Sequence, residues 1–295
     1  MVELSIIILN YKTSDLTIAC LKSIISKFNK ELEFGRFEII VADNGSKDAS
    51  VESIKYYVSS IKYKNIKILE NKENLGFAKG MNKASQNAKG KYLLFLNSDT
   101  EMLDKGLTDM IEFLDSNKKV AILGGKFMNK DGSLQPSCGK FYTLFNLFLM
   151  LIGTERLGFL RESPSIVKKV DWVSGGFMMV KRDIFKKLGC FDENFFMYME
   201  DMDICYRAKK EGWDTYFFPR ACVVHNGHGS SSRTFAIINI YKGILYFYKK
   251  HNSYWQYILA RTLLTAKAIT AIFFGFLTNN IYLKNTYKSV IRIEL

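Results

Sequence analysis

Carboxylate side chains at two places in this sequence have the types and spacing for metal and acid–base chemistry. Asp99 closes the segment Asn97-Ser98-Asp99, which follows an apolar run. A carboxylate there offers the oxygen ligands that a hard divalent cation prefers, although a lone Asn-Ser-Asp more often caps the next helix. Glu200, Asp201 and Asp203 bring three like charges together. Such crowding raises the pKa of a carboxyl toward that of a general base.

Two further segments carry polar residues and glycines suited to holding a nucleotide or another anionic ligand. Asp43 can accept hydrogen bonds from a nucleobase or ribose, although an ordinary turn explains the same residues. Gly76 and Lys79 lie at a predicted helix start, where backbone can approach a ligand closely and a cation can meet an anion. The chain has neither Gly-x-Gly-x-x-Gly after its first strand nor Gly-Lys-Ser or Gly-Lys-Thr. These absences argue against the NAD-binding and P-loop classes.

The elements that must position these residues follow from the hydrophobic pattern. Over the first 127 residues, short apolar runs alternate with amphipathic stretches, which predicts βαβ units and a mostly parallel sheet. The predicted strands, apolar on both faces, are residues 5–9, 37–41, 66–69 and 92–96. Ser14 or Asp15 is expected to cap the first helix, residues 46–50 to lead into the second, and Gly76–Ala88 to form the third. Ligands of open α/β sheets lie beyond the carboxyl ends of the strands, so polar side chains there should line one crevice. They belong to the segments Asn10-Tyr11, Asp43-Asn44-Gly45-Ser46, Asn74-Leu75-Gly76 and Asn97-Ser98-Asp99.

The charge of the chain is concentrated toward its end. The 295 residues carry a formal charge of +13, and after Asp214 ten Lys and Arg stand against one acid, Glu294. This block suits nucleic acid, an anionic membrane face or an anionic small substrate. No nucleic-acid motif is present, and the aromatic residues lie in apolar runs rather than among Lys and Arg. We therefore expect no nucleic-acid partner.

The cysteines and the N-terminus indicate the compartment. The five cysteines are odd in number, irregularly spaced and without a Cys-x-x-Cys pair, which argues against a disulfide framework and a zinc site. Met1–Leu4 has an acid where a signal peptide would have basic residues. We expect reduced thiols and a cytosolic protein.

The apolar stretch 254–283 carries Arg261 and Lys267, so it is not a clean membrane span. It fits helices that lie on a membrane, an interfacial anchor or a buried helical subdomain. The basic flanks favour peripheral contact with the cytoplasmic face, and residues 141–152 could dip into the same interface. A buried helix is about as well supported, and the sequence leaves open whether this tail forms a homodimer.

One long segment gives the chain a family resemblance. Val173-Ser174-Gly175-Gly176 is followed by Gly189-Cys190-Phe191-Asp192 and then by Glu200-Asp201-Met202-Asp203. Together with Asp43, residues 74–82 and Asn97-Ser98-Asp99, these motifs resemble the inverting family 2 glycosyltransferases with the GT-A fold. The resemblance is strongest to the rhamnosyltransferase-like branch and covers about residues 4 to 230. It implies an α/β fold with a Rossmann-like mixed sheet flanked by helices. We expect a catalytic domain over 1–232 and a helical C-terminal extension over 233–295.

The resemblance also implies a role for each matching residue. Asp201, in the Glu200-Asp201 pair, looks like the family's general base, whereas Asp203 and Arg207 have the spacing of a structural ion pair. Asp99 and His225 would ligate Mg²⁺ or Mn²⁺, with Asn97 in place of the leading acid of the family's Asp-x-Asp motif. The residues expected at the donor are Asn10, Asp43, Asn74, Gly76, Lys79, Asn97, Asp99, Gly175 and Gly176. For the glycine pair, a bulge inside a strand is an equal alternative.

The function implied is transfer of a sugar, with rhamnose one candidate, from a dTDP-, UDP- or GDP-linked donor. The acceptor would be a polysaccharide or a polyprenyl-linked oligosaccharide in cell-surface glycan synthesis. Two alternatives remain: a sugar-nucleotide-binding protein with weak catalysis, which the Asn97 departure makes conceivable, and a basic nucleic-acid-binding protein.

Overall fold

The computed structural model describes residues 1–153, 160–227 and 232–293, in two compact units. The first unit comprises Met1–Gly139, Arg161–Phe196 and Glu200–Ser230, and the second Lys140–Leu160, Met197–Met199 and Ser231–Leu295. The expected domain boundary at residue 232 stays a prediction. The sequence did not indicate that Lys140–Leu160 groups with the C-terminal helices.

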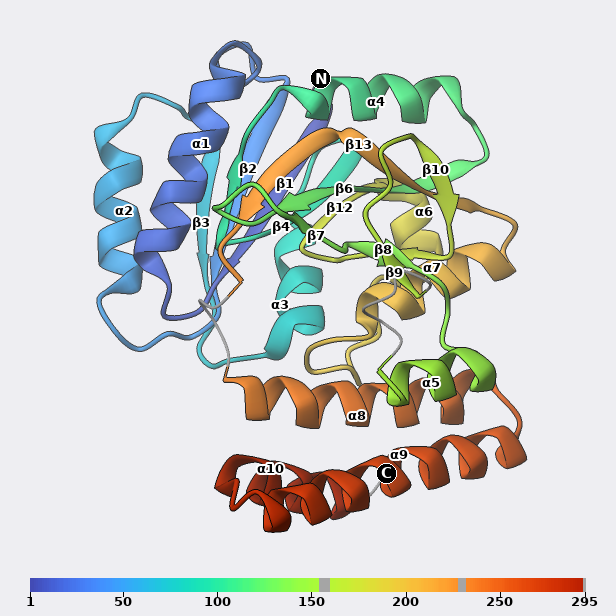
Figure 1. Ribbon diagram of the computed structural model, residues 1–295. Helices are drawn as coiled ribbons and strands as arrows, with labels where there is room; N and C mark the ends of the chain where they lie inside the picture. The colour runs from blue at the N-terminus through green and yellow to red at the C-terminus, as the bar shows by residue number, and fades with distance from the viewer. Residues whose placement is uncertain (154–159, 228–231, 294–295) are drawn as a thin grey trace. The chain divides into compact units, whose positions relative to one another are not determined.

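The first unit is built on one mixed sheet (Figure 1). In spatial order its strands are β10 (Lys168–Val170), β13 (Asp214–His225), β6 (Val120–Met128), β12 (Phe177–Lys181), β4 (Tyr92–Asn97), β1 (Leu4–Asn10), β2 (Phe37–Asp43) and β3 (Ile66–Glu70). Two short strands extend it: β5 (Thr100–Met102) pairs with β13, and β7 (Leu134–Gln135) pairs with β6. A smaller sheet consists of β11 (Trp172–Val173), β8 (Cys138–Gly139) and β9 (Arg161–Glu162). The four strands predicted from apolar runs are β1 to β4, and their pairings are parallel, as expected.

Helices cover both faces of the large sheet, which explains why its strands are apolar on both sides. On one face, α1 (Ser14–Glu33) and α4 (Gly106–Ser116) pack in the same core as Ile6 and Ile8. On the other, Phe185 of α6 (Arg182–Lys187) packs on Phe95 of β4, with ring centroids 5.0 Å apart. Along the chain, α2 (Ser50–Ser60) follows β2, α3 (Gly76–Ser85) follows β3, and α7 (Glu200–Lys210) precedes β13.

Two expected helix ends are wrong. Thr13, rather than Ser14 or Asp15, is the residue before α1, and no side-chain cap bond is present there. The third helix ends at Ser85 instead of Ala88, because N–H groups of Asn87 and Ala88 bond three residues back, to Ala84 and Ser85, in a tighter turn.

The register of the strands sets the polar residues side by side. In the parallel pair β1 and β2, Asn10 lies opposite Asp43, and in β1 and β4, Leu9 lies opposite Asn97. The strand ends therefore meet at one edge of the sheet, as predicted.

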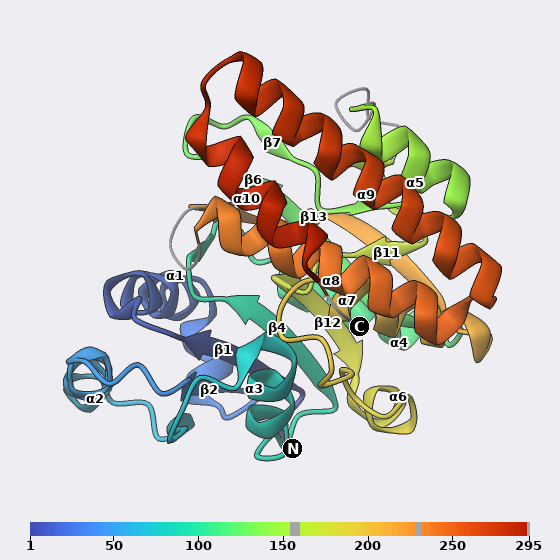
Figure 2. The same cartoon turned by 90° about the horizontal axis from the view of Figure 1, so that it is seen from below.

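The second unit consists of α5 (Leu144–Leu151), α8 (Arg233–His251), α9 (Tyr254–Leu277) and α10 (Ile281–Ile291). Figure 2 shows α8, α9 and α10 alongside one another. Ser253 and Gln256 form a capping box that starts α9. The stretch 254–283 is thus one long helix, a turn and the start of another. By length and composition α9 could cross a membrane, and 22% of its most apolar window is buried in the protein.

Candidate active site

Asp43, at the carboxyl end of β2, is held by its neighbours in the sheet and the following turn. Asn10 Nδ2 donates to Asp43 Oδ1 over 2.7 Å, and the Ser46 N–H donates to Oδ2 over 2.9 Å. The Ser46 hydroxyl also donates to Oδ1. Because the Asp43 side chain is buried and already accepts three hydrogen bonds, it holds the end of β2 and the following turn together at the candidate site. Its direct bond to a nucleobase stays a prediction.

Asn44 joins this strand end to the loop before α3. Its Nδ2 donates to Asn74 Oδ1 over 2.9 Å and to the Gly76 carbonyl over 3.0 Å. Gly76 has φ +78°, and a Cβ there would lie 2.4 Å from the Phe196 carbonyl oxygen, so only glycine fits this helix start. Lys79 is exposed on the first turn of α3.

Asp99 and His225, the two predicted metal ligands, lie next to each other. Antiparallel pairing of β5 with β13 sets His225 opposite Thr100, the residue after Asp99. His225 Nε2 lies 3.4 Å from Asp99 Oδ1, and both side chains are largely buried. The Asn226 N–H donates to the Asp99 carbonyl over 2.9 Å, which fixes the two backbone segments together.

A divalent cation fits this carboxylate and imidazole in chemistry and in spacing. Neighbouring ligands of an octahedral cation at about 2.1 Å lie about 3 Å apart, close to the 3.4 Å between Asp99 and His225. Within the three described ranges, no cluster of three or more His, Cys, Asp or Glu is suited to a metal. Two protein ligands suffice where substrate phosphates and water complete the shell, as is usual for Mg²⁺. His228, a second histidine in the same segment as His225, lies outside the described residues.

The Gly175–Gly176 turn, between β11 and β12, connects Asp201 with Asn97. The Gly175 N–H donates to Asp201 Oδ2 over 3.0 Å, and the Asn97 N–H donates to the Gly176 carbonyl over 3.0 Å. A Cβ on Gly176 would lie 2.6 Å from Asn97 Nδ2, so the amide packs directly on this glycine. The glycines thus form a turn between two strands, and the alternative of a bulge within one strand is wrong.

Glu200 and Asp201 begin α7, and burial raises the pKa of both carboxyls. Asp201 accepts the N–H of Gly175 and, over 2.8 Å at Oδ1, that of Met202, which partly offsets the effect of burial. Glu200 Oε2 is buried with no hydrogen-bond partner in the described part of the chain. Burial, and then the charge of Asp201, hold the Glu200 pKa well above its usual value. Two N–H donors therefore stabilise the Asp201 carboxylate, which suits it to accept a proton.

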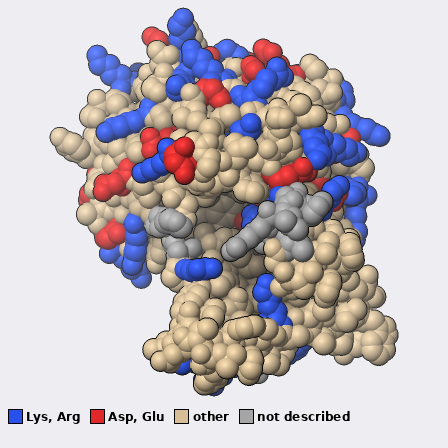
Figure 3. Space-filling view, viewed as in Figure 1, with Lys and Arg blue, Asp and Glu red and all other residues tan. Residues whose placement is uncertain are grey.

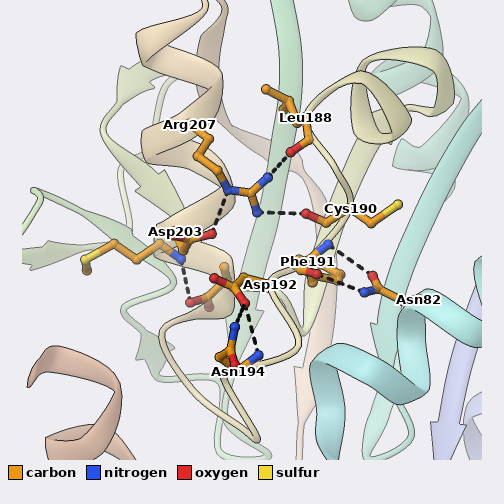
Figure 4. Close-up of polar contacts among 10 residues, drawn as sticks. Asn82, Leu188, Cys190, Phe191, Asp192, Asn194, Asp203 and Arg207 are labelled. Atoms are coloured by element: carbon orange, nitrogen blue, oxygen red, sulfur yellow. Dashed lines mark hydrogen bonds and ion pairs between the residues drawn. The ribbon is translucent and has the colours of Figure 1, made fainter. Parts of the chain in front are cut away.

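Asp203 has the structural role that its spacing predicted. Arg207 Nε donates to Asp203 Oδ2 over 2.7 Å, and the same guanidinium donates to two carbonyls of loop 188–194 (Figure 4). From α3, Asn82 donates to the Phe191 carbonyl over 2.8 Å and accepts its N–H over 3.0 Å. This network fastens the loop that leads into α7, and the expected ion pair is confirmed.

One residue that holds the site, Gln135, was not singled out from the sequence, whereas Asn44 and Ser46 belong to the polar segment predicted after the second strand. Gln135 lies on an exposed-looking segment of the sequence, where nothing signals that it reaches His225 Nδ1 at 2.8 Å.

Comparisons with a family model and with curated relatives indicate the same protein family. Residues 5–189 match the family described as "Glycosyl transferase family 2". The N-acetylglucosaminyl-diphospho-decaprenol L-rhamnosyltransferase of Mycobacterium tuberculosis is 26% identical over 253 residues, covering 76% of this chain and 79% of that protein. Rhamnosyltransferase WbbL of Escherichia coli is 27% identical over 147 residues, covering 49% of this chain and 56% of that protein.

A solved structure shows the same fold. A mannosyltransferase from Pyrobaculum calidifontis, in complex with GDP-Man and Mn²⁺, superposes with a TM-score of 0.60 at 14% identity. The alignment covers 98% of this chain and 85% of that one. The expected GT-A fold, with its mixed sheet flanked by helices, is confirmed.

Proposed function

Since the chain belongs to glycosyl transferase family 2 and is an inverting glycosyltransferase, we propose that it moves a sugar from a nucleotide-diphosphate donor to a glycan or polyprenyl-linked acceptor. L-Rhamnose is the first sugar to test, because two relatives are named rhamnosyltransferases and one name includes a decaprenol-linked acceptor. The observation that carries the proposal is the Gly175–Gly176 turn, which supports Asp201 on one side and Asn97 on the other.

Asp201 acts as the general base in this mechanism. The acceptor hydroxyl loses its proton to the Asp201 carboxylate as its oxygen attacks the anomeric carbon, and the nucleotide diphosphate leaves from the opposite face of the sugar. This single displacement inverts the anomeric centre. Glu200 lies beside this base, and burial holds the pKa of its carboxyl well above the usual value.

Asp99 and His225 would hold Mg²⁺ or Mn²⁺ at the diphosphate. When bound, the cation neutralises the charge that develops on the leaving group. Asn97, at the end of β4, packs its amide on Gly176. The donor would lie over Asn10, Asp43, Asn74, Gly76 and Lys79, with the exposed Lys79 available to an anionic oxygen.

A donor panel tests this function. Purified protein is incubated with UDP-, GDP- and dTDP-sugars, with and without Mn²⁺ or Mg²⁺, and release of the nucleotide diphosphate is measured with and without a polyprenyl-diphosphate glycan acceptor. We expect release from one donor, stimulated by acceptor and lost on chelation. Donor binding without release under every condition would instead support the weakly catalytic binding protein.

The Gly176→Ala variant is expected to lower transfer by about 10²-fold, because the added Cβ must displace the Asn97 amide and a shift near 1 Å has effects of this size. Initial rates with saturating donor measure it. The matched variant Gly175→Ala, whose Cβ would lie 3.3 Å from the nearest atom, should lose less. Equal losses in both would contradict a specific role for the contact with Asn97.

The second unit presents an apolar and basic surface that suits an anionic membrane at the cytoplasmic face. Residues 232–293 contain no Asp or Glu, and Figure 3 shows only tan and blue side chains over α9 and α10 on the visible face. Exposed aromatic and aliphatic side chains on α9 are Tyr254, Trp255, Leu259, Ile269, Phe273, Phe274, Phe276 and Leu277. Lys284 and Lys288 lie over the Phe276 ring. Each such lysine contributes about 1 kcal/mol near anionic headgroups, and a homodimer through the same unit stays a prediction.

We expect the double variant Trp255→Ser, Phe273→Ser to bind vesicles of anionic phosphatidylglycerol at least about tenfold more weakly than the wild type, since two exposed aromatic rings no longer enter the interface. Vesicle co-sedimentation measures the loss. Phe34→Ser, which removes an aromatic side chain that is 76% exposed on the first unit, is the control and should bind normally. Equal binding by all three proteins would argue for the buried-helix interpretation.

A further inference from the structure

Gln135 makes two opposite hydrogen bonds to the same histidine. On β7, its Oε1 lies 2.8 Å from His225 Nδ1, and its Nε2 donates to the His225 backbone carbonyl over 2.9 Å. Gln135 Nε2 also donates to Asn129 Oδ1. A backbone carbonyl can only accept, so the Gln135 amide must point its nitrogen at that carbonyl and its oxygen at the ring.

This orientation settles which ring nitrogen of a neutral His225 carries hydrogen. An amide oxygen accepts, so Nδ1 must be the protonated nitrogen and Nε2 keeps its lone pair. Nε2 is the atom that lies 3.4 Å from Asp99 Oδ1. Two acceptors that face each other in a largely buried place are satisfied by a cation between them.

The ring is also held in its plane. Phe127 of β6 packs on it, with ring centroids 4.8 Å apart at an interplanar angle of 31°. The β6–β7 hairpin that carries Gln135 is itself closed by the Asn129 N–H, which donates to the Ser133 carbonyl over 2.8 Å. Packing, the hairpin and the amide therefore leave the imidazole one orientation.

We propose that Gln135 is a positioning residue that fixes His225 in its Nδ1–H form, so that Nε2 and Asp99 together bind a divalent cation. This inference rests on the proposed function for the purpose of the cation, but its two readouts need no sugar donor. Gln135 itself touches neither cation nor substrate in this arrangement.

The test uses the full chain, labelled with ¹⁵N-histidine, and Mn²⁺ alone. With three histidines in the sequence, the imidazole signals are few, and His225→Gln assigns the relevant one. Long-range ¹H–¹⁵N spectra should show the Nδ1–H form in the wild type. Titration followed by Mn²⁺ electron paramagnetic resonance should give about 10- to 100-fold weaker binding for Gln135→Leu, the range for loss of a residue that orients a metal-binding histidine.

Two variants control for a general effect on the fold. Gln135→Glu keeps an acceptor for Nδ1 and should retain the Nδ1–H form and bind Mn²⁺ more tightly than Gln135→Leu. Leu134→Gln changes the exposed neighbour on the same strand and should leave both readouts as in the wild type. An Nε2–H form in the wild type, no Mn²⁺ binding by the wild type, or unchanged affinity in Gln135→Leu would each overturn the proposal. Failure of donor turnover with both readouts intact would instead overturn the proposed function alone.

Discussion

Asp201→Asn is expected to reduce sugar transfer by about 10²- to 10⁴-fold while donor binding stays close to that of the wild type. The amide keeps an oxygen that can accept the Gly175 N–H, so the turn is preserved, but it cannot take a proton from the acceptor hydroxyl. Single-turnover rates measure the chemical step, and donor titration measures binding. Because burial raises the pKa of Asp201, wild-type activity should fall on acidification at a higher pH than a solvated aspartate would give.

Asp203→Asn provides the contrast for this prediction. Asp203 is buried and paired with Arg207, so loss of its charge should destabilise the fold around loop 188–194 and lower the melting temperature. The protein that remains folded should transfer sugar at the wild-type rate. A fully active Asp201→Asn would remove Asp201 from the role of base. A rate loss confined to Asp203→Asn would transfer that role to Asp203.

Asp99→Asn is expected to lower transfer by about 10²-fold or more and to remove its dependence on Mn²⁺ or Mg²⁺. The change deletes the negative charge beside His225 Nε2, and a cation at a leaving group contributes several kcal/mol to the transition state. Nucleotide release as a function of cation concentration measures the effect. An oxygen–nitrogen ligand pair also suits Mn²⁺ better than Mg²⁺, since imidazole is a softer ligand than carboxylate.

The control for Asp99→Asn is Ser98→Ala, in the same turn. The Ser98 hydroxyl lies 3.1 Å from that of Thr13, within the hydrogen-bonded ends of β1 and β4, so its loss perturbs the turn without touching the charge. We expect Ser98→Ala to retain cation-dependent transfer. If Asp99→Asn responds to Mn²⁺ as the wild type does, Asp99 and His225 do not hold the catalytic cation.

The positions of the strands could be predicted because a buried parallel strand is indicated by the hydrophobicity of its own residues. A run such as residues 92–96 is apolar on both faces, and only a doubly covered strand satisfies that pattern. The carboxyl ends of such strands share one edge, so the proximity of Asn10 to Asp43 followed from the fold class. The cap position of α1 at Thr13 did not follow, because Ser14 and Asp15 are equally good capping residues in isolation.

Residues that reach the site from distant strands could not be predicted from spacing. Gln135 and His225 are 90 positions apart and meet through the shared strand β6. The residue type and position of Asp43 suit a nucleotide. Its carboxylate oxygens nevertheless accept hydrogen bonds from Asn10 and Ser46, and the sequence does not reveal the side-chain directions that make these bonds. Likewise, the grouping of Lys140–Leu160 with the C-terminal helices reflects packing such as the Tyr248 hydroxyl on the Tyr142 carbonyl at 2.7 Å.

The place of β13 in the sheet has a consequence for synthesis of the protein. This strand pairs with β6, for example Asp214 with Val120, which lies 94 positions earlier in the chain. Contacts of such long range form slowly, and until they form one edge of β6 is open to pairing with other chains. A nascent chain that does not yet contain β13 therefore leaves this edge of β6 unpaired and prone to aggregation during synthesis.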